Sequence, residues 1–149
     1  MAHAPLPESP LDLQSVLNHA LGVVRTAAAE LARLSHTDLK VEYKVDGSPV
    51  TNADHASHDI IAKGLSGLGI PVVSEEGGRT PHEERKTWSR MWLVDPLDGT
   101  RSFVERRPAD VTTMVGIAHR GSPLAGIITF PLADARPAAA IWGGPQLGL

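Results

Sequence analysis

Two aspartates at the end of an apolar run are the residues of this chain best suited to chemistry. They lie in the stretch Trp92-Leu93-Val94-Asp95-Pro96-Leu97-Asp98-Gly99-Thr100. The β-prone pair Leu93-Val94 predicts a buried strand, and Pro96 predicts its end because proline has no N–H to give to a strand ladder. Asp95 and Asp98 are therefore expected at a strand-to-turn junction, where open α/β sheets bind their ligands.

The chemistry expected from these aspartates is the binding of a cation beside an anion. Two carboxylates this close repel each other unless a positive charge lies between them, and a hard divalent cation often supplies that charge. Gly99 allows the backbone to approach a ligand closely, and Thr100 can cap a following helical turn. Exposed N–H groups there suit a phosphate. An isolated Asp-x-x-Asp-Gly is more often a plain polar turn, so the interpretation depends on the rest of the chain.

A second apolar run also ends in acidic residues. Val72-Val73 predicts a short strand, and Glu75 and Glu76 follow it. If the two strands are neighbours, the carboxylates of Glu75, Asp95 and Asp98 converge. An all-oxygen cluster of this kind suits Mg²⁺ or Mn²⁺ rather than zinc. Such a cluster beside a glycine turn fits phosphate-ester hydrolysis, in which metals polarise the phosphoryl group and activate a water.

Two helices are expected to position these acids. Apolar residues recur at intervals of three and four over residues 11–34, which predicts a long amphipathic helix. A second helix is expected after Thr51, because an acid three places later, Asp54, completes a helix-start signature. Asp54 is on this evidence equally a structural cap or a functional group. His55 and His58 could bind a metal on one helix face, but no third nitrogen ligand is near, so a solvated polar face is favoured.

The second half of the chain predicts strands. Residues 111–119 and 124–130 predict a hairpin around Arg120-Gly121-Ser122-Pro123, and residues 138–142 predict a further strand. The expected fold class is α/β, in a layered α+β arrangement, with two helices packed on a mixed, largely antiparallel sheet. The Pro-rich residues 1–10 are expected to be a flexible N-terminus, and residues 11–149 to form one metal-binding α/β domain.

Composition excludes several classes of function. The 149 residues carry 14 basic and 17 acidic side chains, a net charge of −3, which gives no footprint for a nucleic acid polymer. There is no cysteine, which excludes disulfides, thiol catalysis and cysteine-ligated zinc. No apolar run approaches the ~20 residues of a transmembrane helix, and the first residues do not resemble a signal peptide. A cytoplasmic protein is therefore expected.

Three motifs in this order resemble the inositol monophosphatase family. They are Asp46-Gly47-Ser48-Pro49-Val50-Thr51-Asn52-Ala53-Asp54, then Glu75-Glu76, then the stretch from Trp92 to Thr100. In detail they are similar to the 3'(2'),5'-bisphosphate nucleotidase (CysQ-type) branch. The resemblance covers residues 11–142 and implies the N-terminal portion of an αβαβα sandwich.

The resemblance implies a metal site. Its ligands would be the side chains of Glu75, Asp95 and Asp98 and the carbonyl oxygen of Leu97. The implied cofactor is Mg²⁺, as two or more ions in the complete site, with Mn²⁺ as a possible substitute and Li⁺ as an inhibitor. Glu75 would also be catalytic.

The resemblance also implies how water and substrate are handled. Thr100, hydrogen-bonded to Asp54, would orient the attacking water and help to deprotonate it. The N–H groups of Gly99 and Thr100 would bind the substrate phosphate, as would Lys44. The implied partner is a small-molecule phosphate ester, with adenosine 3',5'-bisphosphate, hydrolysed to AMP, as the first expectation.

The chain departs from the family pattern in its second half. Members of the family continue for about as many residues again, and that region supplies a further metal-binding aspartate and most substrate-selective contacts. Asp134 lies in a context that does not match that aspartate. We therefore expect the chain to correspond to an N-terminal half that is a poor phosphatase by itself. We also expect it to self-associate through an uncovered sheet edge.

Other functions remain open at this point. Inositol-1-phosphate and histidinol-phosphate hydrolysis are rivals, because Arg101-Ser102-Phe103 departs from the Lys-Glu-Phe often seen in the nucleotidase branch. A truncated, catalytically weak paralogue that only binds metal or pairs with another chain is the non-catalytic alternative. An aspartyl-nucleophile phosphatase needs Asp-x-Asp spacing, and a serine hydrolase needs Gly-x-Ser-x-Gly; the sequence has neither.

Overall fold

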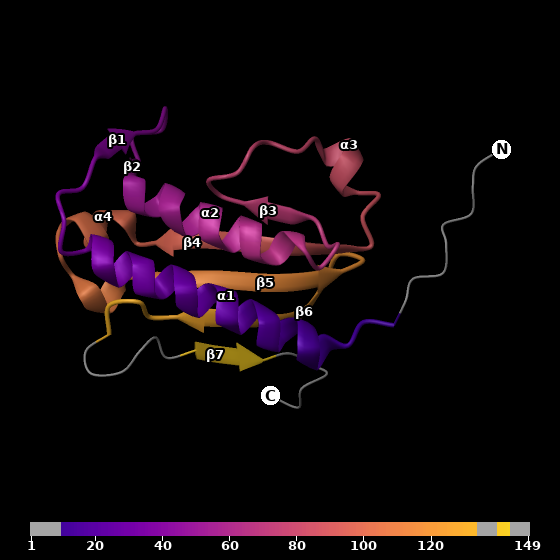
Figure 1. Cartoon of the computed structure of the whole chain (residues 1–149). Coiled ribbons are helices and arrows are strands. Elements are labelled where there is room, and N and C mark those ends of the chain that lie inside the picture. Colours follow the sequence, from indigo (N-terminus) through magenta and orange to yellow (C-terminus); the bar gives the residue numbers. More distant parts are fainter. Residues whose placement is uncertain (1–9, 134–139, 144–149) are drawn as a thin grey trace.

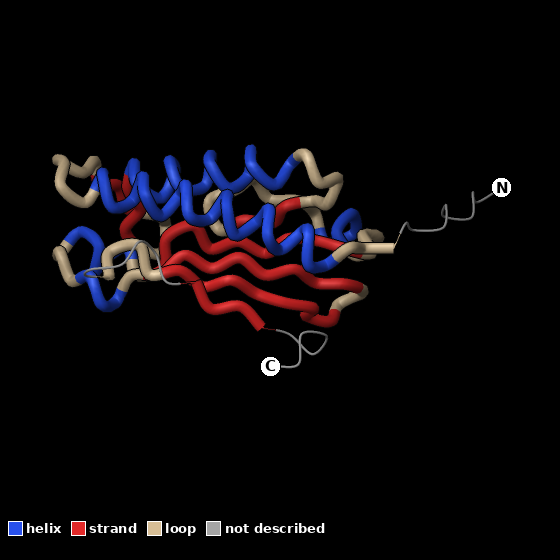
Figure 2. Tube along the Cα trace, turned by 60° about the horizontal axis from the view of Figure 1, so that its bottom comes forward, coloured by secondary structure: helices blue, strands red, loops and turns tan. Residues whose placement is uncertain are grey.

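The computed structural model describes residues 10–133 and 140–143. Two long helices, α1 (Leu13–Leu34) and α2 (Asn52–Ser66), lie side by side on one face of a five-stranded sheet (Figures 1 and 2). The strands, in their spatial order, are β3 (Val72–Ser74), β4 (Arg90–Asp98), β5 (Thr112–His119), β6 (Ser122–Thr129) and β7 (Ala140–Gly143). β3 runs parallel to β4, and the other three pairs are antiparallel. The predicted fold class, two helices on a mixed, largely antiparallel sheet, is confirmed.

Short elements surround this frame. The strands β1 (Val41–Tyr43) and β2 (Pro49–Thr51) form a separate hairpin that leads into α2. The helical turn α3 (His82–Arg85) lies between β3 and β4. The helix α4 (Thr100–Val104) follows β4, and a 3₁₀ turn, η1 (Pro108–Asp110), precedes β5.

Both long helices start at side-chain caps. The side chain of Asp12 accepts a hydrogen bond from the Ser15 N–H at the start of α1 (3.1 Å). At the start of α2, Thr51 and Asp54 form the predicted capping box. The apolar stripe of α1 faces the sheet, as its periodicity predicted, and its fully buried members include Leu17, Val24 and Leu31.

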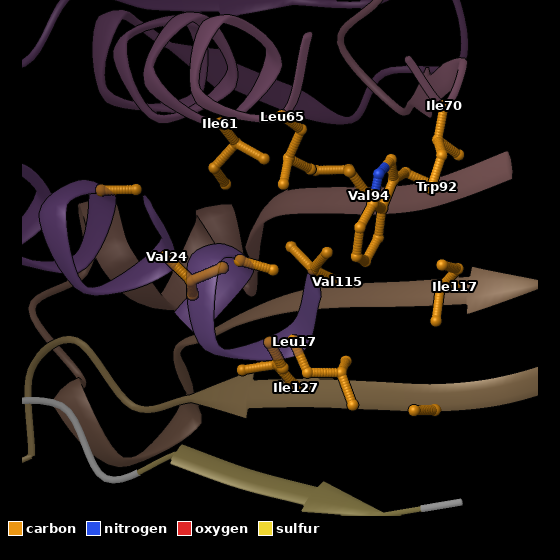
Figure 3. Close-up of a cluster of buried hydrophobic side chains, with 13 residues drawn as sticks. Leu17, Val24, Ile61, Leu65, Ile70, Trp92, Val94, Val115, Ile117 and Ile127 are labelled. Carbon is orange, nitrogen blue, oxygen red and sulfur yellow. The ribbon is translucent and has the colours of Figure 1, made fainter. Parts of the chain in front are cut away.

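The main core lies between the helices and the sheet (Figure 3). Alternate residues of β4, β5 and β6 point into it, as the period of two in a strand requires. Its labelled members in Figure 3 are Leu17, Val24, Ile61, Leu65, Ile70, Trp92, Val94, Val115, Ile117 and Ile127. A second cluster holds the turn after β4 in place: Leu31, Leu34, Ala53, Leu97, Phe103 and Val111.

Two details of the strand predicted at Leu93-Val94 were wrong. Leu93 is not buried: its side chain is 47% exposed, because it lies on the sheet face opposite to the helices. Pro96 does not end the strand either, since β4 continues to Asp98. The register with β5 shifts between Asp95 and Asp98, so Pro96 needs no ladder hydrogen bond there.

The predicted hairpin at 111–130 is present as β5 and β6. Arg120 and Gly121 form its two-residue turn with positive φ values of 49° and 79°. The strand expected at 138–142 corresponds to β7 in its described part. Residues 1–9 and Asp134 lie outside the described residues. Within the part of the chain that the structure describes, no helix is both long and apolar enough to cross a membrane.

Candidate active site

The parallel pairing of β3 with β4 brings the two acid-bearing strand ends together. Ser74 lies opposite Val94, and the Glu75 N–H donates to the Val94 carbonyl oxygen (3.0 Å). Glu75 and Asp95 are therefore neighbours at the same end of adjacent strands. Their carboxyl groups are in hydrogen-bonding contact.

Asp95 shows how strongly negative charge is concentrated here. Burial, followed by the charges of Glu75 and Asp98 and the hydrogen bond with Glu75, raises the pKa of Asp95 from 3.8 to about 7. The Leu97 N–H donates to Asp95 Oδ1 (3.2 Å) and acts in the opposite direction. Because the charged form is disfavoured without a counter-ion, this position has the electrostatics of a cation site.

Lys44 supplies part of the compensating charge. Its Nζ donates to Glu76 Oε1 (2.6 Å) and Glu75 Oε1 (3.1 Å) from the turn between β1 and β2. Burial alone would lower the pKa of Lys44, but the hydrogen bonds to Glu76 and Glu75 outweigh it and raise the pKa above its usual range. The expected role of Lys44 in phosphate binding stays a prediction, because in this structure Lys44 pairs with the two glutamates.

Asp98 lies apart from the acid pair. Its side chain is exposed, and its Oδ2 accepts a hydrogen bond from the Thr112 hydroxyl (3.3 Å). Among the described residues, no group of three or more His, Asp or Glu side chains is close enough to hold a metal ion. The structure thus brings Glu75 and Asp95 together but does not gather the expected set of three. The metal-ligand roles stay a prediction.

Thr100 and Asp54 are brought together from positions 46 residues apart. Thr100 Oγ1 donates to Asp54 Oδ1 (2.7 Å), and Thr51 donates to Asp54 Oδ2 through its N–H (2.7 Å) and its hydroxyl (2.6 Å). Asp54 is only 1% exposed. The same carboxylate therefore caps α2 with one oxygen and holds the Thr100 hydroxyl with the other.

Gly99 is required by the geometry of the turn. Its φ is +84°, and a Cβ atom at this position would run into the carbonyl oxygen of Asp110. Gly99 is also the N-cap of α4, so Thr100 begins that helix. The expected phosphate contacts of the Gly99 and Thr100 N–H groups stay a prediction.

Two residues that the sequence analysis did not single out hold the bulge of β4 between Asp95 and Asp98. The register shift leaves the Pro96 carbonyl without a strand partner, and the hydroxyls of Ser57 (2.7 Å) and Thr113 (3.0 Å) donate to it instead. Both hydroxyl residues are completely buried. For Ser57, the signal that could have found it is its place among the apolar residues on the buried face of an amphipathic helix.

The prediction that His55 and His58 lie on a solvated face of α2 is wrong for His58. Its side chain is half-buried, and its Nδ1 lies 2.9 Å from the hydroxyl oxygen of Ser74 in a hydrogen bond. His55 is exposed, as expected.

The donor set fits a hard divalent cation. Glu75 and Asp95 offer carboxylate oxygens, Asp98 follows at the end of the same strand, and the Leu97 carbonyl oxygen lies 3.2 Å from the Thr100 hydroxyl oxygen. Oxygen donors with excess negative charge suit Mg²⁺ or Mn²⁺. An open hollow of about 470 Å³ on the outer face of the sheet has Glu75 and Asp95 among its lining residues.

A model of the inositol monophosphatase family matches residues 12–148. The chain belongs to this family. The resemblance found in the three motifs is thereby confirmed, and the acid pair, Thr100 and Asp54 all lie in the matched part.

Two curated relatives share one name. The chain is 34% identical over 125 residues to the 3'(2'),5'-bisphosphate nucleotidase CysQ of Buchnera aphidicola, covering 81% of this chain and 46% of the relative. It is 41% identical over 104 residues to the protein of the same name from Shigella flexneri, covering 68% of this chain and 42% of the relative. The chain thus spans less than half the length of these curated relatives.

Solved structures agree on the fold. CysQ from Bacteroides thetaiotaomicron, described as a bacterial member of the inositol monophosphatase family, superposes with a TM-score of 0.71 at 28% identity. The match covers 94% of this chain and 53% of that one. The extragenic suppressor protein suhB from Bartonella henselae gives a TM-score of 0.72 at 25% identity, covering 87% of this chain and 52% of that one.

Proposed function

We propose that this chain carries the metal-binding and water-activating part of a Mg²⁺-dependent phosphomonoesterase. The observation that carries the proposal is the Thr100–Asp54 hydrogen bond, together with the Glu75–Asp95 carboxyl pair. Family membership supports the reaction class, and the CysQ relatives support a 3'(2'),5'-bisphosphate nucleotide, such as adenosine 3',5'-bisphosphate, as the substrate.

The residues that would hold Mg²⁺ are Glu75, Asp95 and Asp98, with the carbonyl oxygen of Leu97. The chemistry that the ion supplies when bound is a lowered pKa of water and neutralisation of charge on the phosphoryl oxygens. Glu75 and Asp95 must both be ionised to contribute, so a bound cation would lower the raised pKa of Asp95.

Thr100 acts on the attacking water. Since its hydroxyl proton already points to Asp54 Oδ1, its oxygen lone pairs are free to accept a proton from water. As that proton arrives, Thr100 passes its own proton to Asp54, which the hydrogen bonds from Thr51 keep in place. The Gly99 and Thr100 N–H groups at the start of α4 bind the phosphate.

The test is phosphate release from adenosine 3',5'-bisphosphate, inositol 1-phosphate and histidinol phosphate, with and without Mg²⁺. We expect release that depends on Mg²⁺ and is fastest with the bisphosphate, the substrate class in the names of the relatives. The release should be slow, because the chain spans less than half the length of these relatives and fewer residues position the substrate. Thr100→Val should lower the rate by a factor of about 10²–10⁴, and Asp95→Asn should abolish it.

Thr87→Val is the control for Thr100→Val, because it removes an exposed hydroxyl bonded only locally, to the Glu84 carbonyl. It should leave the rate unchanged. Release that does not depend on Mg²⁺, or that persists in Asp95→Asn, would contradict the proposal. A preference for inositol 1-phosphate or histidinol phosphate would keep the reaction class and overturn the nucleotide substrate.

A further inference from the structure

Three polar residues on one face of α2 reach three different parts of the site. Asp54, Ser57 and His58 are spaced i, i+3 and i+4, so they lie on the same side of the helix. Asp54 accepts from Thr100, Ser57 donates to the Pro96 carbonyl, and His58 bonds to Ser74. Within this set, the role of His58 is explained neither by capping nor by the mechanism above.

Ser74, the partner of His58, is the last residue of β3 and precedes Glu75 directly. Its carbonyl oxygen accepts from the Gly77 N–H (3.0 Å), which closes a tight turn with Glu75 and Glu76 at its centre. His58 therefore anchors, through the Ser74 hydroxyl, the first residue of the turn that carries the glutamates.

The imidazole of His58 also packs against the other end of this turn. A Cβ atom on Gly77 would lie 3.4 Å from His58 Cε1 and 3.3 Å from the Ser74 carbonyl oxygen. The ring thus contacts the turn at Ser74 and at Gly77. Lys44, from the turn between β1 and β2, holds the carboxylates of Glu75 and Glu76.

We propose that His58 is a positioning residue for Glu75, which it directs toward Asp95 by holding the turn from Ser74 to Gly77. The inference rests on the proposed function, in which Glu75 is a metal ligand. Ser57 does the same for the bulge between Asp95 and Asp98, so consecutive residues of one helix hold both acid-bearing segments. Removal of a side chain that orients a metal ligand typically lowers metal affinity by 10- to 100-fold.

The first test uses the metal-free chain and measures hydrogen exchange at the Glu75 and Gly77 amides. In His58→Ala these two amides should exchange at least about tenfold faster, while those of β5 and β6 stay unchanged. His58→Asn should restore slow exchange, because its side-chain amide takes the place of Nδ1. His55→Ala, which removes the exposed histidine of the same helix, is the control. Equal exchange in His58→Ala and His55→Ala overturns the proposal.

The second test is the Mg²⁺ concentration that gives half of the maximal thermal stabilisation. It should rise by about 10- to 100-fold in His58→Ala and in Ser74→Ala, and no further in the double variant, because the two side chains act as one unit. Unchanged half-stabilising concentrations in both single variants overturn the proposal. A wild-type chain without any Mg²⁺ response counts against the proposed function, and the exchange at Glu75 then decides the role of His58 separately.

Discussion

Asp54 accepts hydrogen bonds from three donors, and they serve two purposes. The N–H and hydroxyl of Thr51 tie it to the start of α2, and the hydroxyl of Thr100 ties it to the start of α4. A buried carboxylate needs such donors, because an unpaired charge away from water is very unfavourable. Its structural and functional roles therefore depend on each other.

Asp95 makes the stability of the metal-free chain depend on pH. Its folded-state pKa is about 7 against the ordinary 3.8, so the folded chain holds this proton more tightly than the unfolded chain does. That contribution to stability is complete below pH 3.8 and is lost as the pH rises through about 7. Stability therefore falls as the pH rises, whereas a salt-bridged aspartate makes stability rise with pH.

We expect Asp95→Asn, which mimics the protonated side chain, to be more stable than the wild type above pH 7. The difference should be on the order of 1–2 kcal/mol once solvent screening of a half-exposed group is allowed for, and small near pH 4. Urea unfolding at pH 4, 6 and 8 without divalent metals measures it. Asp59→Asn, which changes an exposed aspartate of α2, is the control: its difference from the wild type in free energy of unfolding should not increase from pH 4 to pH 8. A less stable Asp95→Asn at pH 8 would contradict the prediction.

At the scale of elements, the buried part of α2 organises the bulge near the end of β4. The register shift between β4 and β5 removes a strand partner from the Pro96 carbonyl, and Ser57 of α2 and Thr113 of β5 replace it. The bulge is therefore tied to both layers of the fold. This arrangement sets the position of the backbone between Asp95 and Asp98.

Removal of these hydroxyls should show that they share one acceptor. We expect Ser57→Ala and Thr113→Val to cost about 1 kcal/mol each, because the Pro96 carbonyl keeps one donor in either variant. The double variant should cost more than the sum, since a buried acceptor is then left without a partner. Urea unfolding measures all three. Ser66→Ala removes an exposed hydroxyl of the same helix and should change stability by less than about 0.5 kcal/mol. Simple additivity of the two substitutions would contradict this account.

At the scale of the whole molecule, the two faces of the sheet differ. α1 and α2 cover one face, and none of the helices in the described part of the chain lies on the other (Figure 2). The outer face carries Leu93 and Ile128, which are 47% and 37% exposed, around the paired glycines Gly116 and Gly126. An apolar sheet surface of this kind favours association.

We expect the purified chain to self-associate through this outer face. Leu93→Lys together with Ile128→Lys should shift the chain toward monomer in sedimentation velocity, because burying two ammonium groups opposes contact. Val45→Lys changes an exposed apolar residue of the β1–β2 turn and should leave the association unchanged. The prediction would be contradicted if the wild-type chain is already monomeric at high concentration. It would also be contradicted if Val45→Lys shifts the chain toward monomer as much as the double variant does.

The sequence alone determined the local elements and the chemical character of the site. The intervals of three and four in α1, the capping box of α2 and the alternation in β5 and β6 depend only on neighbouring residues, and all are present. The acids, the glycine and the threonine of the motif at 92–100 were equally visible, and the family followed from them.

Only the tertiary structure decided how these parts meet. The parallel pairing of β3 with β4 places Glu75 beside Asp95, and the shift in register carries β4 past Pro96. The hydrogen bonds of Thr100, Ser57 and His58 span 46, 39 and 16 residues. No local periodicity encodes such contacts, because they depend on which strands pair, in which register, and which helix face packs on them.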